Sequence, residues 1–273
     1  MAHNTHEDKY SGLIADIKRK RNLVIILTII GAIVLVTLTS PIQLEVVGEV
    51  LIDYRGVHPA ITVGLVLLCM FIEIIAYAAV SAPLTSAMDT ECDPEKQLIL
   101  NTALSKPGSV DHVFTVDYLY LGDYPKALPY AEKMIASGKT PSLLAGLFHK
   151  ARCEFGMGNY EGLRDTEKRY AATLSSTKIH PKAMPAYLQM HAILLLLCAL
   201  AENDTEKIRV LGEQIMPWNC AKPTQGYVNY LKGLAAFRTG NKEEAIYRLT
   251  AVKDICPKTV FAMLAEEHLL SLG

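Results

Sequence analysis

The stretch GYVNYLKGLAAFRTGNKEEAIYRLTAVKDICP, residues 226–257, decides the fold of the larger part of this chain. The turn residues Gly240-Asn241 interrupt it near its middle, and Glu244-Ala245 follows shortly after. Glycine followed by asparagine marks a turn between two periodic segments. The stretch therefore predicts one helix–turn–helix unit, in a chain whose pattern is helical from Asp89 onward.

The same pattern of turn residues occurs three more times before this unit. It is present in Leu121-Gly122-Asp123-Tyr124, in Met157-Gly158-Asn159-Tyr160 and in Glu202-Asn203-Asp204-Thr205. The turn residues at positions 122, 158, 203 and 240 are 36, 45 and 37 residues apart, and an insertion around residues 174–182 accounts for the longest spacing. Self-similarity with a period of about 34 residues is typical of a helical solenoid. We therefore expect an all-α domain of about four helix–turn–helix repeats.

The last unit resembles the tetratricopeptide repeat (TPR) family. In that family, small residues stand where Gly233 and Ala245 stand here, so that the two helices cross closely. A proline ends the unit where this chain has Pro257. The third unit departs most from the pattern, because Asn203 and Ile208 replace the glycine and the alanine.

The resemblance covers about residues 108–257 of the chain. It implies a TPR-like solenoid, in which helices at residues 94–105 and 258–271 cap the two ends and hide their apolar faces. It implies a general role in binding other proteins but names no partner, because one fold hosts many functions.

The charges are unevenly spread, although hydrophobic residues make up 51% of the 273 residues and charged residues 20%. Residues 1–22 carry five basic and three acidic side chains, residues 23–83 one and four, and residues 84–273 twenty-one of each. No segment has the Lys/Arg excess that neutralises phosphates, so we expect no nucleic-acid partner. The distribution predicts a basic tail (1–22), a membrane anchor (23–83) and a TPR-like domain (84–273).

Two apolar runs inside the anchor are long enough to cross a bilayer. Residues 23–39 contain no charge over 17 residues, which is about 25 Å of helix. Residues 60–82 form a run of 23 residues with a single charge, Glu73. We therefore expect a two-helix transmembrane hairpin in the plasma membrane, of bacterial type.

The orientation of the hairpin follows from its flanking charges. The basic cluster at residues 18–21 directly precedes the first span, whereas the loop at residues 40–58 has three acidic residues and only Arg55. Positive charge near a span stays in the cytoplasm. We expect the loop outside, and the N-terminus and residues 84–273 in the cytoplasm.

Two other topologies are compatible with the apolar runs. The first run could be the apolar core of a cleaved signal peptide, but it exceeds the usual length of about 7–15 residues and no A-x-A-like site follows Thr39. Residues 187–201 could form a third span, but this stretch is shorter than the required length of about 18 residues. Its length favours a buried helix at the centre of the solenoid.

Glu73 has two interpretations. A carboxylate deep in a bilayer costs several kcal/mol, which indicates a partner helix, a proton site or a substrate path. The alternative is a protonated side chain that is hydrogen-bonded within the hairpin, for instance to a threonine of the first span. The sequence leaves both open.

Motifs of enzymes are missing from the sequence. It has no G-x-S-x-G, H-E-x-x-H, P-loop or G-x-G-x-x-G pattern. The six cysteines form no C-x-x-C pair and the eight histidines are dispersed, so we expect buried thiols in a reducing compartment. We expect no enzymatic activity, no cofactor, no metal and no small-molecule substrate.

In the resembled family, the first helix of each unit lines a concave groove. Counting back from the turns gives the expected partner-binding residues, which are His112, Tyr120, Phe148, Arg152, Tyr227, Tyr230 and Arg238. The count also reaches Val116, Phe155 and Phe237, which a buried helix face explains as well. Aromatic rings supply contact area and arginine can take a carboxylate bidentately, so the pattern suits peptide binding.

Two classes of function remain. The first is a membrane-tethered scaffold or adaptor, whose groove binds a peptide or helix of another cytoplasmic or membrane protein. The alternative is an accessory or regulatory subunit of a membrane complex, which contacts its partners through the hairpin and Glu73.

Overall fold

The computed structural model describes residues 4–39, 58–105, 111–219 and 221–273. These residues form twelve helices and no strand, which confirms the all-α part of the predicted fold class. The helices are α1 (Asn4–Thr39), α2 (His58–Asp89), α3 (Pro94–Leu104), α4 (Asp111–Leu121), α5 (Tyr124–Ala136), α6 (Thr140–Gly156), α7 (Tyr160–Ser176), α8 (Met184–Glu202), α9 (Thr205–Gln214), α10 (Lys222–Arg238), α11 (Lys242–Ile255) and α12 (Val260–Leu272).

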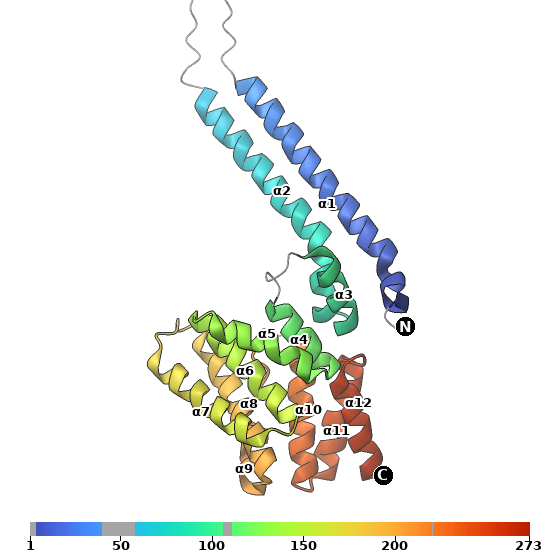
Figure 1. The fold of residues 1–273 in the computed structure, drawn as a ribbon, viewed down its shortest axis with the longest axis vertical. Helices are drawn as coiled ribbons and strands as arrows, with labels where there is room; N and C mark the ends of the chain where they lie inside the picture. Colours follow the sequence, from blue (N-terminus) through green and yellow to red (C-terminus); the bar gives the residue numbers. More distant parts are fainter. Residues whose placement is uncertain (1–3, 40–57, 106–110, 220) are drawn as a thin grey trace, which may run out of the picture. The chain divides into compact units, whose positions relative to one another are not determined.

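The chain divides into two compact units, residues 1–83 and residues 84–273. The first unit contains α1 and most of α2, and the second contains the end of α2 and the ten helices that follow (Figure 1). The expected external loop at residues 40–58 lies outside the described residues except for His58.

Both helices of the first unit extend beyond the predicted spans. The helix α1 begins at Asn4, so most of the basic tail is helical. Asp16 supports that extension, because it pairs with Arg19 at 3.0 Å and with Lys20 at 2.6 Å, one turn further along. The helix α2 continues through Pro83 to Asp89, beyond the end of the expected span at residue 82.

Two helices of the described chain are long and apolar enough to cross a membrane, by length and composition alone. One is the part of α2 from Val66 to Asp89, and the other is α8, Met184–Glu202. In α8 the side chains of Ile193, Leu194 and Leu196 are fully buried, and the helix packs against α6, α7 and α9. These contacts are those of a core helix in the second unit.

Four turns with the same backbone conformation connect helices of the second unit. Gly122, Gly158 and Gly240 adopt left-handed conformations, with φ of 78°, 74° and 79°, and Asn203 does so with φ of 54°. Glycine and asparagine are the residues that tolerate this region best. These are the four turn residues that the spacing of the sequence identified.

Each of these turns ends with a residue that caps the next helix. The side chains of Asp123, Asn159, Asp204 and Asn241 each accept a hydrogen bond from the backbone N–H three residues later, at 3.1–3.3 Å. A cap of this kind stabilises a helix start by about 1 kcal/mol. Turn and cap together explain why α5, α7, α9 and α11 begin where they do.

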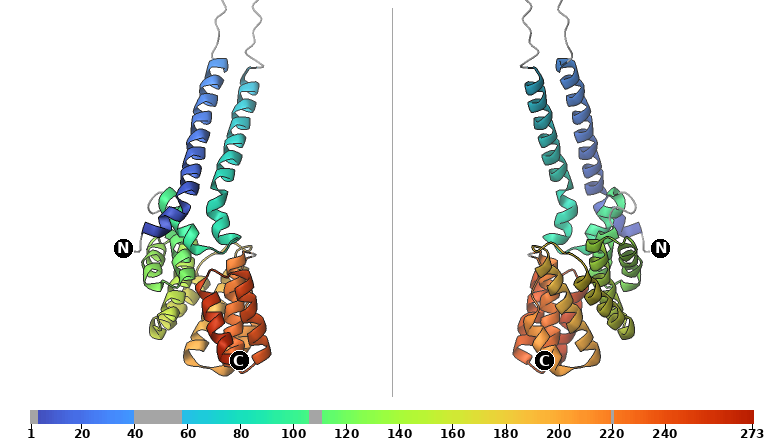
Figure 2. Two further views of the ribbon diagram at one scale, coloured as in Figure 1. Left: turned by 90° about the vertical axis from the view of Figure 1, so that its right-hand side faces the viewer. Right: turned by 90° about the vertical axis from the view of Figure 1, so that its left-hand side faces the viewer.

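Neighbouring helices along the chain pack against each other in the second unit, as α4 with α5, α5 with α6 and α10 with α11. Two views show α10, α11 and α12 side by side (Figure 2). The last helix also reaches the first turn of the series, because a Cβ placed on Gly122 would lie 2.8 Å from Cγ2 of Val260. The helix α12 therefore packs against α4 as well as against α10.

Candidate functional site

A cavity of about 240 Å³ lies inside the second unit, between helices that are far apart in the sequence. α4 contributes residues four positions apart, which lie on one face of a helix. α6, α8, the start of α10 and the segment before it supply most of the other walls. The lining residues are Met88, Asp89, His112, Val116, Tyr120, Ala145, Phe148, His149, Arg152, Met190, Trp218, Asn219, Ala221, Pro223 and Thr224.

Arg152 is the charged centre of this cavity. Its side chain is only 4% exposed, and four aromatic rings surround its guanidinium group, those of Tyr120, Phe148, Tyr227 and Phe261. The guanidinium carbon lies 4.0 Å from the centre of the Tyr227 ring, 5.3 Å from that of Tyr120 and 5.5 Å from that of Phe148. A cation over an aromatic face gains about 0.5–2 kcal/mol, so the rings partly replace the water that burial removes.

The charge of Arg152 has no counterion among the described residues. Its Nε and Nη2 atoms are buried and have no hydrogen-bond partner there. Burial works against the charge, but the neighbouring phenols of Tyr227 and Tyr120 outweigh it and keep the pKa of Arg152 above its ordinary value. Arg152 therefore places a fixed positive charge at the wall of the cavity, with two buried N–H groups that have no partner among the described residues.

Two histidines lie beside the arginine. The rings of His112 and His149 are 5.3 Å apart, and Nδ1 of the buried His149 has no partner among the described residues. Burial lowers the pKa of His149 well below its ordinary value, and the nearby His112 and Arg152 lower it further. His149 is therefore neutral at pH 7, and the positive charge of the site is that of Arg152.

The arrangement suits an anionic group and no obvious catalytic chemistry. Arginine presents its N–H groups as a planar fork that matches a carboxylate. Among the residues that the structure describes, no group of three or more His, Cys, Asp or Glu side chains is placed to hold a metal ion. The cavity is therefore a candidate site for a carboxylate-bearing group.

The structure brings four of the predicted groove residues together. His112, Tyr120, Phe148 and Arg152 all line the cavity, although they come from two different helices. Tyr227 is not among the lining residues, but its buried side chain packs directly against that of Arg152.

Two predicted residues lie elsewhere. Tyr230 is buried against α12, where its ring centre lies 5.3 Å from that of Phe261. Arg238 is exposed, and its Nη1 atom donates a hydrogen bond to Oδ1 of Asn203 at 3.5 Å. The groove expected along α10 is covered, because the Phe261 side chain of α12 also contacts Tyr227, at 4.8 Å between ring centres.

The sequence pattern did not identify several of the other lining residues, among them His149, Trp218 and Thr224. His149 is one of the dispersed histidines of the sequence, yet it lies beside Arg152 because the two are three positions apart on α6. Trp218 and Thr224 come from the segment before α10 and from its first turn. Only the tryptophan, which is the single one in the chain, carried a signal in the sequence.

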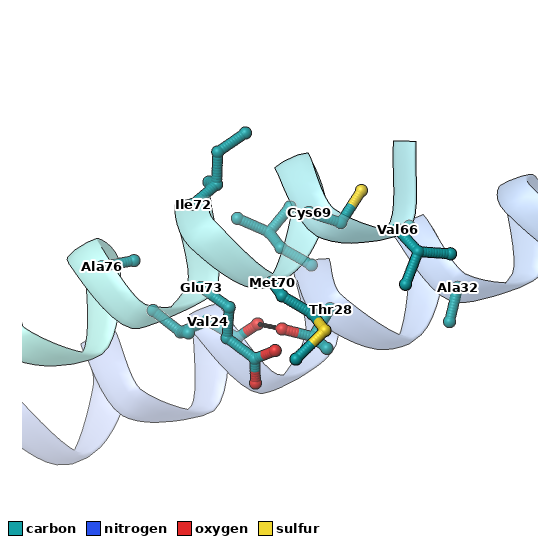
Figure 3. Close-up of a pocket in the computed structure, with 11 residues that line it drawn as sticks. Val24, Thr28, Ala32, Val66, Cys69, Met70, Ile72, Glu73 and Ala76 are labelled. Carbon is teal, nitrogen blue, oxygen red and sulfur yellow. Dashed lines mark hydrogen bonds between the residues drawn. The ribbon is translucent and has the colours of Figure 1, made fainter. Parts of the chain in front are cut away.

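A second feature lies in the first unit, between α1 and α2. A crevice of about 290 Å³ there is lined almost entirely by apolar side chains, and its polar members are Glu73 and Thr28. Figure 3 shows both among the lining residues, Glu73 from α2 and Thr28 from α1. Thr28 donates its hydroxyl hydrogen bond to the carbonyl of Val24 at 3.0 Å.

No protein-family model, curated protein or solved structure matches this chain. A function can therefore be inferred only from the geometry of the cavity around Arg152 and of the crevice that contains Glu73.

Proposed function

We propose that this chain is a two-span membrane protein whose cytoplasmic residues 84–273 form a TPR-like adaptor. Its cavity binds a carboxylate-bearing segment of a protein partner. The observation that carries this proposal is the unpaired guanidinium group of Arg152 at the wall of the cavity.

The energetics of a buried charge support this reading. An ion removed from water without a counterion costs several kcal/mol even after relaxation. A carboxylate that accepted a hydrogen bond from the guanidinium group of Arg152 would offset part of that cost, because a charge-assisted bond is worth about 1.5–3 kcal/mol. The cavity volume of about 240 Å³ suits an acidic side chain or a chain terminus better than a whole folded element.

The first unit supports the membrane assignment. Large apolar side chains on α1 and α2 are more than half exposed in the unit by itself, which would be costly in water. These side chains are Leu23, Ile25, Ile26, Leu27, Ile29, Ile30, Ile33, Val63, Leu67, Leu68, Met70, Phe71, Ile72, Ile74, Ile75 and Tyr77. A lipid environment around both helices removes that cost, and the basic cluster at residues 18–21 favours a cytoplasmic N-terminus.

The second unit supports the TPR-like assignment. Its helices pack as neighbours along the chain, and its four equivalent turns recur at the spacing of the repeats. Gly233 and Ala245 also lie where α10 and α11 approach closely, since a Cβ on Gly233 would be 2.7 Å from Cγ of Leu249. Ala245 is fully buried in the same interface.

Binding of matched peptides to the full-length protein in detergent tests the adaptor function. An array of short peptides that carry Asp, Glu or a free terminal carboxylate is compared with the same peptides in amide form. Wild-type protein should prefer the acidic set. Arg152→Met should bind the preferred peptides about 10–100-fold more weakly, because it loses charge-assisted hydrogen bonds.

Arg238→Met is the matched control, since Arg238 is exposed on α10 and lies outside the cavity. It should bind like the wild type. Equal binding by wild type and Arg152→Met, or no preference for the acidic peptides, would exclude this function of the cavity.

The alternative function is an accessory or regulatory subunit that contacts a membrane complex through the hairpin. The crevice that contains Glu73 favours it, because a carboxylate among apolar side chains of a membrane segment is costly and indicates a function. In-membrane crosslinking of partners to full-length protein separates the two readings. Partners lost with Glu73→Leu and kept with Arg152→Met would favour the subunit, and the reverse pattern would favour the adaptor.

A further inference from the structure

Two cysteines that are 164 positions apart meet in the interior of the second unit. The Sγ atoms of Cys92 and Cys256 are 2.7 Å apart, and both side chains are almost completely buried. Cys92 follows the end of α2, and Cys256 caps the end of α11. Neither residue lies in a sequence motif, so only the fold brings the two thiols together.

The backbone around Cys92 is held in place by its own hydrogen bonds. Cys92 has a left-handed conformation with φ of 48°, which is uncommon for a residue with a side chain. Its amide donates to the carbonyl of Met88 at 3.1 Å, and the amide of Asp93 donates to that of Ala87 at 2.8 Å. This geometry directs the Cys92 thiol at Cys256.

Other contacts join the same two segments. The Lys258 ammonium group donates to the buried carboxylate of Asp93 at 2.7 Å. The Lys222 ammonium group donates to the carbonyl of Thr90 at 3.0 Å, and Cys256 Sγ lies 3.4 Å from the carbonyl of Lys222. The thiol pair therefore lies at a junction of three segments: the link between α2 and α3, the start of α10 and the loop before α12.

This junction adjoins the cavity. Met88 and Asp89, just before Cys92, form one part of its wall. Pro223 and Thr224, just after Lys222, form another part. A covalent bond at the junction would hold these two parts of the wall at a fixed separation.

We propose that Cys92 and Cys256 form a reversible disulfide that clamps the end of α2 to the C-terminal helices. In a reducing compartment the pair remains a dithiol, and it closes when the disulfide pool becomes oxidised. The existence of this bond does not depend on what the cavity binds.

The bond forms by exchange with a low-molecular-weight disulfide, such as oxidised glutathione. The Cys92 thiolate attacks one sulfur of the external disulfide, forms a mixed disulfide and releases one external thiolate. Cys256 then loses its proton and attacks the Cys92 sulfur, which releases the second external thiolate. Two protein thiols and one external disulfide thus give one protein disulfide and two external thiols.

The electrostatics favour Cys92 as the attacking residue. The hydrogen bond with Cys256 lowers the pKa of Cys92, and the charge of Lys222 contributes in the same direction against the effect of burial. The same hydrogen bond and burial raise the pKa of Cys256. Since both sulfurs are buried, the exchange requires the link between α2 and α3 to open, so we expect it to be slow.

The test uses full-length protein in detergent, incubated with oxidised glutathione, alkylated and mapped by mass spectrometry. We expect a linked peptide pair that contains Cys92 and Cys256 and that dithiothreitol separates. In the oxidised protein, amides of residues 86–96 and 253–260 should exchange hydrogen more slowly, and the melting temperature should rise by several degrees. These three readouts do not involve the cavity's ligand.

Matched variants exclude other pairings. Cys92→Ser and Cys256→Ser should each abolish the linked pair and the rise in melting temperature, whereas Cys153→Ser and Cys198→Ser should keep both. If a serine variant fails to fold, the comparison of oxidised and reduced wild type still decides. Two outcomes would overturn the proposal. In the first, Cys92 and Cys256 stay alkylatable in the folded protein, while the same oxidant links them after unfolding. In the second, the disulfide forms but the amides of the two segments do not exchange hydrogen more slowly.

Discussion

The guanidinium group of Arg152 stacks over the ring of Tyr227, with 4.0 Å between the guanidinium carbon and the ring centre. The two residues belong to α6 and α10, and both are buried. This contact holds a permanent positive charge inside a mainly apolar interior without a carboxylate. A charge kept in this way contributes little to stability.

Replacing Arg152 should therefore cost little stability. In Arg152→Met we expect the free energy of unfolding to stay within about 1 kcal/mol of the wild type, because the lost cation–π contacts are offset by relief of the buried charge. Denaturant titration of the full-length protein measures it. Phe148→Ala in the same wall should cost about 3–5 kcal/mol, and an equally large loss for Arg152→Met would mean that the arginine is structural.

His149 should make the domain acid-sensitive. Burial lowers the pKa of His149 in the folded state, so below about pH 6.5 the unfolded chain takes up a proton that the folded chain does not. The free energy of unfolding should fall by up to about 1.4 kcal/mol per pH unit as the pH drops from 6.5. His149→Leu should reduce this slope, and the exposed His180→Gln should leave it unchanged. An unchanged slope in His149→Leu would contradict the prediction.

Asp117 should have the opposite dependence on pH. It is fully buried on α4, neither carboxylate oxygen has a partner among the described residues, and burial raises its pKa well above the ordinary value. Above about pH 4 the unfolded chain releases a proton that the folded chain retains, which destabilises the fold.

Asp117→Asn should therefore raise the melting temperature at pH 7 and have almost no effect near pH 4. Thermal unfolding at the two pH values measures both effects. The exposed Asp165→Asn serves as control. Destabilisation by Asp117→Asn at pH 7 would indicate that the carboxylate is ionised and paired in the folded protein.

The close approach of α10 and α11 should not tolerate larger side chains. A Cβ on Gly233 would already lie 2.7 Å from two atoms of Leu249, so Gly233→Leu should destabilise by about 1–3 kcal/mol. Ala245→Leu should act similarly, since Ala245 has no exposed surface. Lys242→Leu, at an exposed position, should change the melting temperature little. If leucine is tolerated equally at all three positions, α10 and α11 do not pack closely at Gly233 and Ala245.

Reporter fusions should reveal the topology. A reporter after Gly273 should read cytoplasmic and one inserted near Gly48 should read external, if the basic cluster at residues 18–21 sets the orientation as we propose. Moving the four basic residues into the loop should weaken or invert the orientation. A C-terminal reporter found outside would overturn the cytoplasmic assignment.

The turns were readable from the sequence because their chemistry is local. Glycine or asparagine in a left-handed conformation, followed by a capping Asp or Asn, uses contacts within about four residues of the chain. The positions 122, 158, 203 and 240 could therefore be identified, and with them the ends of α4, α6, α8 and α10 and the starts of the helices that follow them. The same local counting placed His112 and Tyr120 on one face of α4, and Phe148 and Arg152 on one face of α6.

Residues far away in the sequence cover the predicted groove along α10, so the local pattern could not show that it is closed. Tyr230 was expected to face a partner, but Phe261 from α12 lies against it. A helical pattern tells which face of α12 is apolar without telling which surface that face will cover.

The sequence by itself determined the helical class, the turns and the uneven distribution of charge, because each depends on neighbouring residues or on composition. Only the tertiary structure decided that Arg152 is buried without a counterion, that Tyr227 supports it, and that Cys92 meets Cys256. These relationships join residues 75 or more positions apart. Their physical reason is the packing of whole helices, whose relative placement minimises exposed apolar area over the entire domain and is encoded in no single stretch of the chain.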